Sequence, residues 1–115
     1  MNTRKYSKNQ ESRVAKNLKG KRQANSGATP FFKGDVVTEH FCIECKTSMT
    51  EKKSTSIKRD WVDKLKEEAF AMGKPYWAVA FNFGGLDNPE NFYVIDEKLF
   101  LRLINYLEGS EWTKL

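Results

Sequence analysis

Apolar residues recur along the first part of this chain at a helical spacing. Val14 and Leu18 lie four residues apart, which places both on one face of a helix. Ser7 and Gln10 have the spacing of a capping box, and Gly20 can end the helix that they begin. The stretch from Ser7 to Gly20 therefore predicts the first helix.

Two further stretches repeat apolar residues at helical spacing. The first begins after a candidate cap at Ser56 and continues to about Met72, and the second begins after a candidate cap at Asp96 and ends at Gly109. Each presents one apolar stripe, made of Ile57, Trp61, Val62, Leu65, Ala69 and Met72 in the first and of Leu99, Phe100, Leu103, Ile104 and Leu107 in the second. Both stripes are typical of helices that pack against another surface.

Short runs rich in β-branched and aromatic residues predict four strands. Residues 35–47 read as two strands joined by a hairpin turn near Thr38–His40, and residues 76–83 and 92–95 read as a third and a fourth. The second helix separates the second strand from the third, so these two strands are expected to be parallel. The order α-β-β-α-β-β-α predicts an α/β fold with a small mixed sheet flanked by helices.

Length and composition are those of one folded domain spanning residues 1–115. Hydrophobic residues make up 39% of the chain and charged residues 30%, which is an ordinary globular balance. No apolar run approaches the ~20 residues that a membrane span needs. The first ten residues, MNTRKYSKNQ, are basic and polar without an apolar segment, so no secretory signal and no membrane association are expected, and a cytoplasmic location follows.

Charge is distributed unevenly. Residues 1–33 contain nine Lys or Arg and one Glu, a net +8, whereas residues 34–115 contain eleven basic and fourteen acidic residues, a net −3. The excess lies in a basic N-terminal arm, residues 1–10, in the following helix, and in a basic loop, residues 20–33. This distribution favours a polyanion as partner, most simply nucleic acid, over the alternative of a solubilising tail.

The two cysteines do not predict a metal or redox centre. Cys42 and Cys45 have C-x-x-C spacing, but a zinc site needs further ligands and His40 is the chain's one histidine. The pair also lies in a predicted strand, where positions three apart face opposite sides of the sheet. Two reduced core cysteines are therefore expected.

A pair of carboxylates and a lysine are predicted to meet on the sheet. Strand alternation puts Glu44 and Lys46 on the same face, and pairing within the hairpin brings Asp35 beside them. Facing carboxylates repel unless a cation lies between them, and hard oxygen ligands suit Mg²⁺. The arrangement favours a metal-dependent phosphodiesterase centre, against the alternative of a solvated strand face with a turn aspartate.

Two neighbouring features support the same chemistry. Glu11 lies on or beside the apolar stripe of the first helix, where a carboxylate is costly unless it has a partner or a role. The stretch NSGATPFFKGD, which joins that helix to Asp35, is made of small and basic residues suited to approaching a phosphate backbone. Both lie in the basic part of the chain.

In order and spacing, these motifs resemble those of the PD-(D/E)xK nuclease superfamily, and within it the small Holliday junction resolvases of archaeal type. The resemblance runs from about Glu11 to Phe83, and a compatible strand and helix follow. It is carried by Glu11, by SGA at Ser26–Ala28, by KGD at Lys33–Asp35 and by IECK at Ile43–Lys46. One departure is that Asp35 follows a glycine and not a proline.

The resemblance implies a restriction-endonuclease-like core and a homodimeric enzyme that uses Mg²⁺, with Mn²⁺ as a substitute, to cut four-way DNA junctions. Asp35 and Glu44 would be metal ligands, and Glu11 would complete the metal site. Lys46 would be the catalytic lysine, and Ser26 would lie near the scissile phosphate.

Contacts with the DNA backbone are expected from polar and basic residues around this centre: Lys19, Lys21, Arg22, Ser26, Lys33 and Lys58. Two alternatives remain open. The chain could be another nuclease of the same superfamily, acting as a nickase or repair endonuclease on other branched or damaged DNA. It could also be a non-catalytic DNA-binding protein with a nuclease-like fold.

Overall fold

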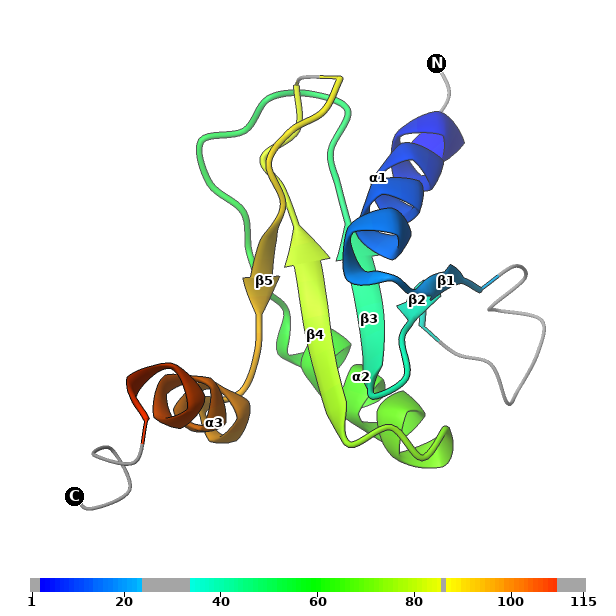
Figure 1. Ribbon diagram of the computed structural model, residues 1–115. Coiled ribbons are helices and arrows are strands. Elements are labelled where there is room, and N and C mark those ends of the chain that lie inside the picture. Colours follow the sequence, from blue (N-terminus) through cyan, green and yellow to red (C-terminus); the bar gives the residue numbers. More distant parts are fainter. Residues whose placement is uncertain (1–2, 24–33, 86, 110–115) are drawn as a thin grey trace.

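The structure, a computed structural model, describes residues 3–23, 34–85 and 87–109 of the chain. Within these ranges it contains three helices and five strands (Figure 1). In chain order they are α1 (Thr3–Leu18), β1 (Lys21–Arg22), β2 (Val36–Val37), β3 (Phe41–Lys46), α2 (Arg59–Ala71), β4 (Tyr76–Phe81), β5 (Phe92–Val94) and α3 (Glu97–Glu108). The predicted α/β class is confirmed, with the two-residue strand β1 added to the predicted order.

The five strands form one mixed sheet in the order β1-β2-β3-β4-β5. β3 and β4 are parallel and the other neighbours are antiparallel, so the predicted parallel pair is confirmed. The hairpin between β2 and β3 is closed at Thr38, whose N–H donates to the Phe41 carbonyl and whose hydroxyl accepts from the Phe41 N–H. The predicted turn near Thr38–His40 is therefore also present.

Helices α1 and α2 pack against opposite faces of the sheet, and β3 contributes alternate side chains to each core. Ile43 lies on the α1 side and Cys42 on the α2 side. Buried residues on the α1 side are Val14, Val36, Ile43, Ala78 and Ala80, and those on the α2 side are Cys42, Leu65, Ala69, Trp77 and Val79. The two-residue period predicted for this strand is confirmed, and it places Glu44 and Lys46 on the α2 side.

The beginnings of the first two helices differ from the prediction. α1 begins at Thr3, so Ser7 lies inside the helix, and most of the residues expected as a basic arm form its first turns. α2 begins at Arg59 after Lys58, whose side chain makes no capping bond, and Ile57 precedes the helix and is 37% exposed. A cap contributes only about 1 kcal/mol, so neighbouring helix-forming residues and packing against the sheet override it.

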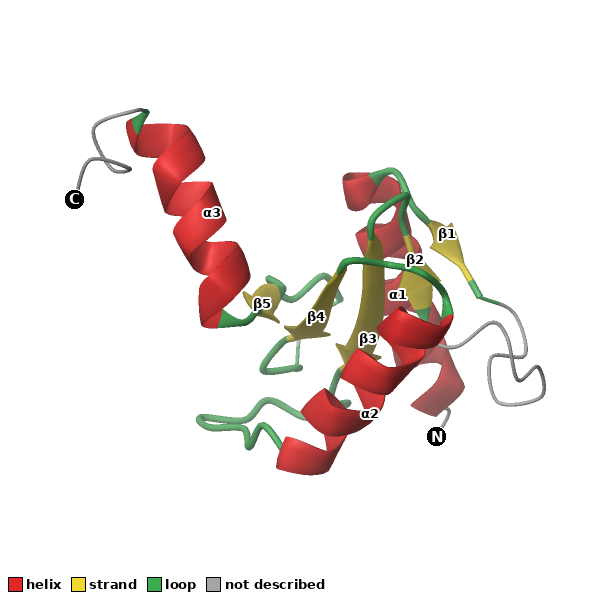
Figure 2. Ribbon diagram, turned by 90° about the horizontal axis from the view of Figure 1, so that it is seen from below, coloured by secondary structure: helices red, strands yellow, loops and turns green. Residues whose placement is uncertain are grey.

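Helix α3 begins and ends where the sequence predicts. The Asp96 side chain accepts from the Leu99 N–H at 2.8 Å, and Gly109 follows the last turn with φ +74°. The helix projects away from the sheet beyond β5 (Figure 2). Arg102 links it back to the start of β4, because its guanidinium donates to the Tyr76 hydroxyl and lies 5.6 Å from that ring.

Candidate active site

The site lies at the start of the short strand β2, where the paired strand β3 extends beyond it. Val36 pairs with Ile43, so Asp35 falls opposite Glu44 in the same register. The Asp35 N–H donates to the Ile43 carbonyl at 2.9 Å, and the Asp35 carboxylate accepts from the Cys45 N–H at 2.8 Å. The carboxylate thus satisfies an amide of β3 that β2 is too short to reach, and this fixes its position beside Glu44.

Gly34 explains why no proline precedes Asp35. Its φ is +82°, and a Cβ at this position would lie 2.6 Å from the Cys42 sulfur. Proline is locked near φ −65° and cannot adopt this conformation. The glycine at this position is therefore a consequence of how the chain enters β2, and Asp35 falls in register opposite Glu44.

Glu44 lies in an environment that disfavours its charged form. Its side chain is 24% exposed. Burial first, then the charge of Asp35, raises the pKa of Glu44 to about 7, and a hydrogen bond with Asp35 acts in the same direction. Lys46 opposes this rise from a distance of 3.6 Å between its Nζ and Glu44 Oε1. The predicted meeting of Asp35, Glu44 and Lys46 is confirmed.

Glu11 approaches the same edge of the sheet from α1. Burial, followed by the charge of Asp35, raises the pKa of Glu11, and Arg22 lowers it through a contact of 3.3 Å. Glu11 is thus close enough to Asp35 for their charges to interact, but its ion pair is with Arg22 of β1. The charge of Arg22, which is expected to contact DNA, is therefore partly neutralised by Glu11.

The carboxylates fit a magnesium ion better than a metal with many protein ligands. Within the described ranges, no three His, Cys, Asp or Glu side chains lie close enough together to form a metal-binding group. Mg²⁺ is commonly held by one or two carboxylates, with waters and phosphate oxygens completing its shell. The adjacent carboxylates of Asp35 and Glu44 meet that requirement, whereas a metal-binding role of Glu11 stays a prediction.

The remaining predicted site residues are distributed around this centre. Lys19 and Lys21 are exposed at the end of α1 and in β1, and Lys58 is exposed at the start of α2. Ser26 and Lys33 lie outside the described residues. Of the predicted DNA contacts that the structure describes, Lys19, Lys21 and Arg22 thus belong to the α1–β1 segment and Lys58 directly precedes α2.

Two residues of α2 belong to the site and were not predicted as part of it. Trp61 lies under the Lys46 ammonium, with 4.5 Å between Nζ and the ring centroid. Glu68 is 8% exposed, and its charge contributes to raising the pKa of Glu44. Both face the sheet. For Trp61, the apolar stripe of α2 and the alternation of β3 were the sequence patterns that could have predicted its place beside Lys46.

Comparison with known proteins returned no family model, no curated protein and no solved structure that matches this chain. In the part of the chain that the structure describes, no helix has both the length and the apolar character needed to cross a bilayer.

The raised pKa of Glu44 predicts an unusual pH dependence of stability. In metal-free protein, the folded state holds the Glu44 proton up to about pH 7, whereas the unfolded chain releases it near the ordinary value of 4.5. The associated stabilisation is complete below about pH 4.5 and is lost as the pH rises through 7, with a size on the order of 1–3 kcal/mol.

Urea unfolding in EDTA across this pH range measures the effect. Glu44→Gln resembles the protonated side chain and should flatten the curve. A Gln variant whose stability depends on pH as strongly as that of the wild type would contradict the assignment.

Proposed function

We propose that this protein is a magnesium-dependent, structure-specific DNA endonuclease that resolves four-way junctions by paired nicks. The observation that carries the proposal is the adjacent pair of carboxylates, Asp35 and Glu44, with the Lys46 Nζ 3.6 Å from Glu44 Oε1. Two adjacent carboxylates are stable together only when a proton or a cation lies between them. A binding module would have no use for such a pair close to phosphate.

Each residue of the centre has a chemical task in this proposal. Asp35 and Glu44 would hold the cation, which would supply polarisation of the phosphodiester and a lowered pKa of an attacking water. Lys46 stabilises the negative charge that develops on the phosphate oxygens. Glu11 and Ser26 keep the roles that the resemblance implies, as a further metal ligand and as a contact near the scissile phosphate.

Basic side chains on both sides of the centre bind the DNA backbone. Lys19, Lys21 and Arg22 lie on the side of α1 and β1, and Lys58 lies on the side of α2. Contacts of this kind orient the duplex without reading its sequence. A substrate recognised through its branched shape requires this kind of binding.

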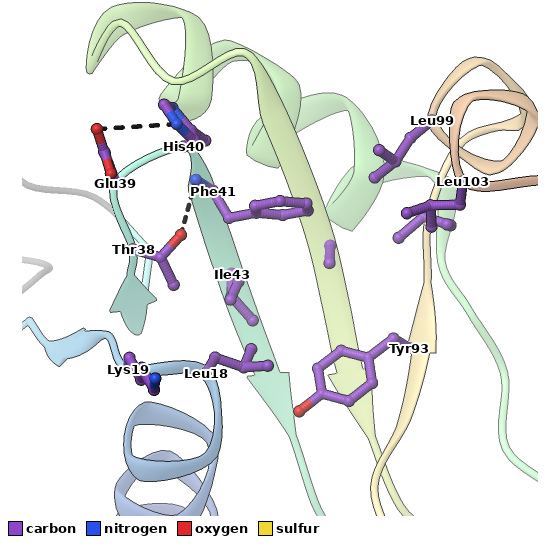
Figure 3. Close-up of a pocket in the computed structure, with 12 residues that line it drawn as sticks. Leu18, Lys19, Thr38, Glu39, His40, Phe41, Ile43, Tyr93, Leu99 and Leu103 are labelled. Carbon is purple, nitrogen blue, oxygen red and sulfur yellow. Dashed lines mark hydrogen bonds and ion pairs between the residues drawn. The ribbon is translucent and has the colours of Figure 1, made fainter. Parts of the chain in front are cut away.

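Two nicks on opposed strands require two active sites, and the proposed partner is a second copy of the chain. The C-terminal half of α3 exposes large apolar residues, of which Tyr106 is 85% and Leu107 76% exposed. Beside the first turns of α3 lies an apolar groove of about 570 Å³ (Figure 3). Its walls include Leu18 of α1, Phe41 and Ile43 of β3, Tyr93 of β5, and Leu99 and Leu103 of α3.

This surface is suited to a two-fold interface. Exposed apolar side chains on a projecting helix and an apolar groove beside it can serve both copies reciprocally, as closed two-fold symmetry requires. The same symmetry matches that of a four-way junction. The interface so formed uses the final helix and the groove, which also reaches Lys19 and the β2–β3 turn at Thr38–His40. The carboxylate pair lies at the other end of that hairpin, where Asp35 falls opposite Glu44.

A cleavage assay on three DNA substrates tests the activity. We expect a four-way junction to be cut in Mg²⁺ or Mn²⁺ at two symmetry-related positions, and a linear duplex and a nicked flap to be cut much more slowly. EDTA should abolish cleavage. Preference for the flap would favour a repair endonuclease, binding without cleavage would favour a non-catalytic protein, and cleavage that persists in EDTA would exclude the metal-dependent mechanism.

A further inference from the structure

The Lys46 ammonium lies between two different kinds of partner. On one side its Nζ is 3.6 Å from Glu44 Oε1, and on the other it is 4.5 Å from the centre of the Trp61 ring. The Lys46 side chain is 36% exposed. A partly exposed lysine paired with one carboxylate normally keeps most of its conformational freedom, because such pairs contribute little. The indole is the second constraint.

An indole suits this position better than another polar group. The face of the ring attracts the ammonium through its quadrupole. It accepts no conventional hydrogen bond, so the N–H donors of Lys46 stay available for phosphate oxygens. A second carboxylate would bind those donors and add negative charge where DNA must approach.

Trp61 is itself held by a rigid element. It lies in the first turn of α2, and its ring packs against the buried cluster on the α2 side of the sheet. The Lys58 ammonium is also near the ring, at 5.9 Å. One indole thus lies close to both Lys46 and Lys58.

We propose that Trp61 is a positioning residue for the reaction: its indole holds the Lys46 ammonium in the place where it meets the scissile phosphate. The catalytic role of Trp61 rests on the proposed function. The contact between Trp61 and Lys46 does not depend on any activity. Trp61 acts through Lys46 and touches no reacting atom.

The test compares Trp61→Leu and Trp61→Phe with the wild type. Phe70→Leu is the matched control, because this aromatic residue of α2 is 88% exposed. The first measurement is by NMR on the protein without DNA. Ring current from Trp61 should shift the Lys46 methylene protons upfield, and Trp61→Leu should return them to ordinary values while Phe70→Leu leaves them unchanged.

The second measurement separates turnover from binding on the four-way junction. Since cation–π contacts weaken from Trp to Phe and are absent with Leu, we expect single-turnover cleavage to fall ~10-fold in Trp61→Leu and ~3-fold in Trp61→Phe. The Kd for the junction should change by less than about twofold. A merely structural role would lower thermal stability and leave turnover of the folded protein unchanged.

Three outcomes decide the matter. Lys46 shifts that do not respond to Trp61→Leu overturn the contact. Altered shifts with wild-type turnover overturn the positioning role. Failure of the wild type to cut any branched DNA overturns the proposed function, and the catalytic role of Trp61 with it, while the NMR result still decides the contact. Should Trp61→Leu not fold, the graded loss in Trp61→Phe decides.

Discussion

Asp35→Asn and Glu44→Gln are each expected to reduce cleavage of a four-way junction by ~10²-fold or more, because each removes a charge that stabilises the reacting centre. Both replacements keep the size and shape of the side chain. Asn at position 35 also keeps an oxygen that can accept from the Cys45 N–H, where the carboxylate now accepts at 2.8 Å. The local fold should therefore survive, and the loss should be chemical.

DNA binding by these variants should be unchanged or tighter. Asp35→Asn removes a negative charge from a surface that faces phosphate. Glu44→Gln removes less charge near neutral pH in metal-free protein, because burial and Asp35 raise the pKa of Glu44 to about 7. In these variants, the affinity for DNA measured in EDTA should thus stay the same or increase, while cleavage measured in Mg²⁺ falls.

Exposed acidic residues of α2 supply matched controls. Asp63→Asn makes the same chemical change at a carboxylate that is 57% exposed and paired with Arg59, and Glu67→Gln does so at another exposed position. Neither should alter cleavage. Retention of wild-type turnover in Asp35→Asn or Glu44→Gln would exclude these carboxylates from the chemistry.

The second large effect concerns assembly. Light scattering should give twice the chain mass of 13.3 kDa for the wild type, and the double variant Tyr106→Lys, Leu107→Lys should give the mass of one chain. These side chains are 85% and 76% exposed, so their replacement leaves the core of each copy intact. Two ammonium groups within an apolar interface would be costly to desolvate.

Glu108→Lys is the control for charge, because it changes the same turn of α3 outside the apolar stripe and should leave the mass doubled. The double variant should nick a junction without pairing the two nicks. A wild-type protein that stays monomeric at working concentration would contradict the proposed interface and favour a nickase.

Backbone periodicity made the centre of the candidate site predictable. A strand alternates its side chains strictly, so Glu44 and Lys46 had to share a face wherever β3 lay. The tight hairpin at Thr38 then set the register that puts Asp35 opposite Glu44. The same local logic predicted the cap at Asp96 and the apolar stripe of α3, since each depends only on neighbours within a few residues.

Residues whose role depends on contacts between elements could not be assigned this way. Gln10 was predicted as part of a capping box, yet it is fully buried and its amide donates to the Lys46 and Ala80 carbonyls and to Asn91. It joins α1 to the ends of β3 and β4. Nothing near it in the sequence shows that these carbonyls need a donor.

The sequence by itself determined the α/β order, the parallel pair and the faces on which the charged residues lie. Only the tertiary structure decided that Glu11 pairs with Arg22, and that Trp61 lies against Lys46 and not only in the core. The physical reason is one of range. Alternation and capping follow from bonded geometry over a few residues, whereas a contact of 3.3 or 4.5 Å between elements depends on how whole helices pack against the sheet.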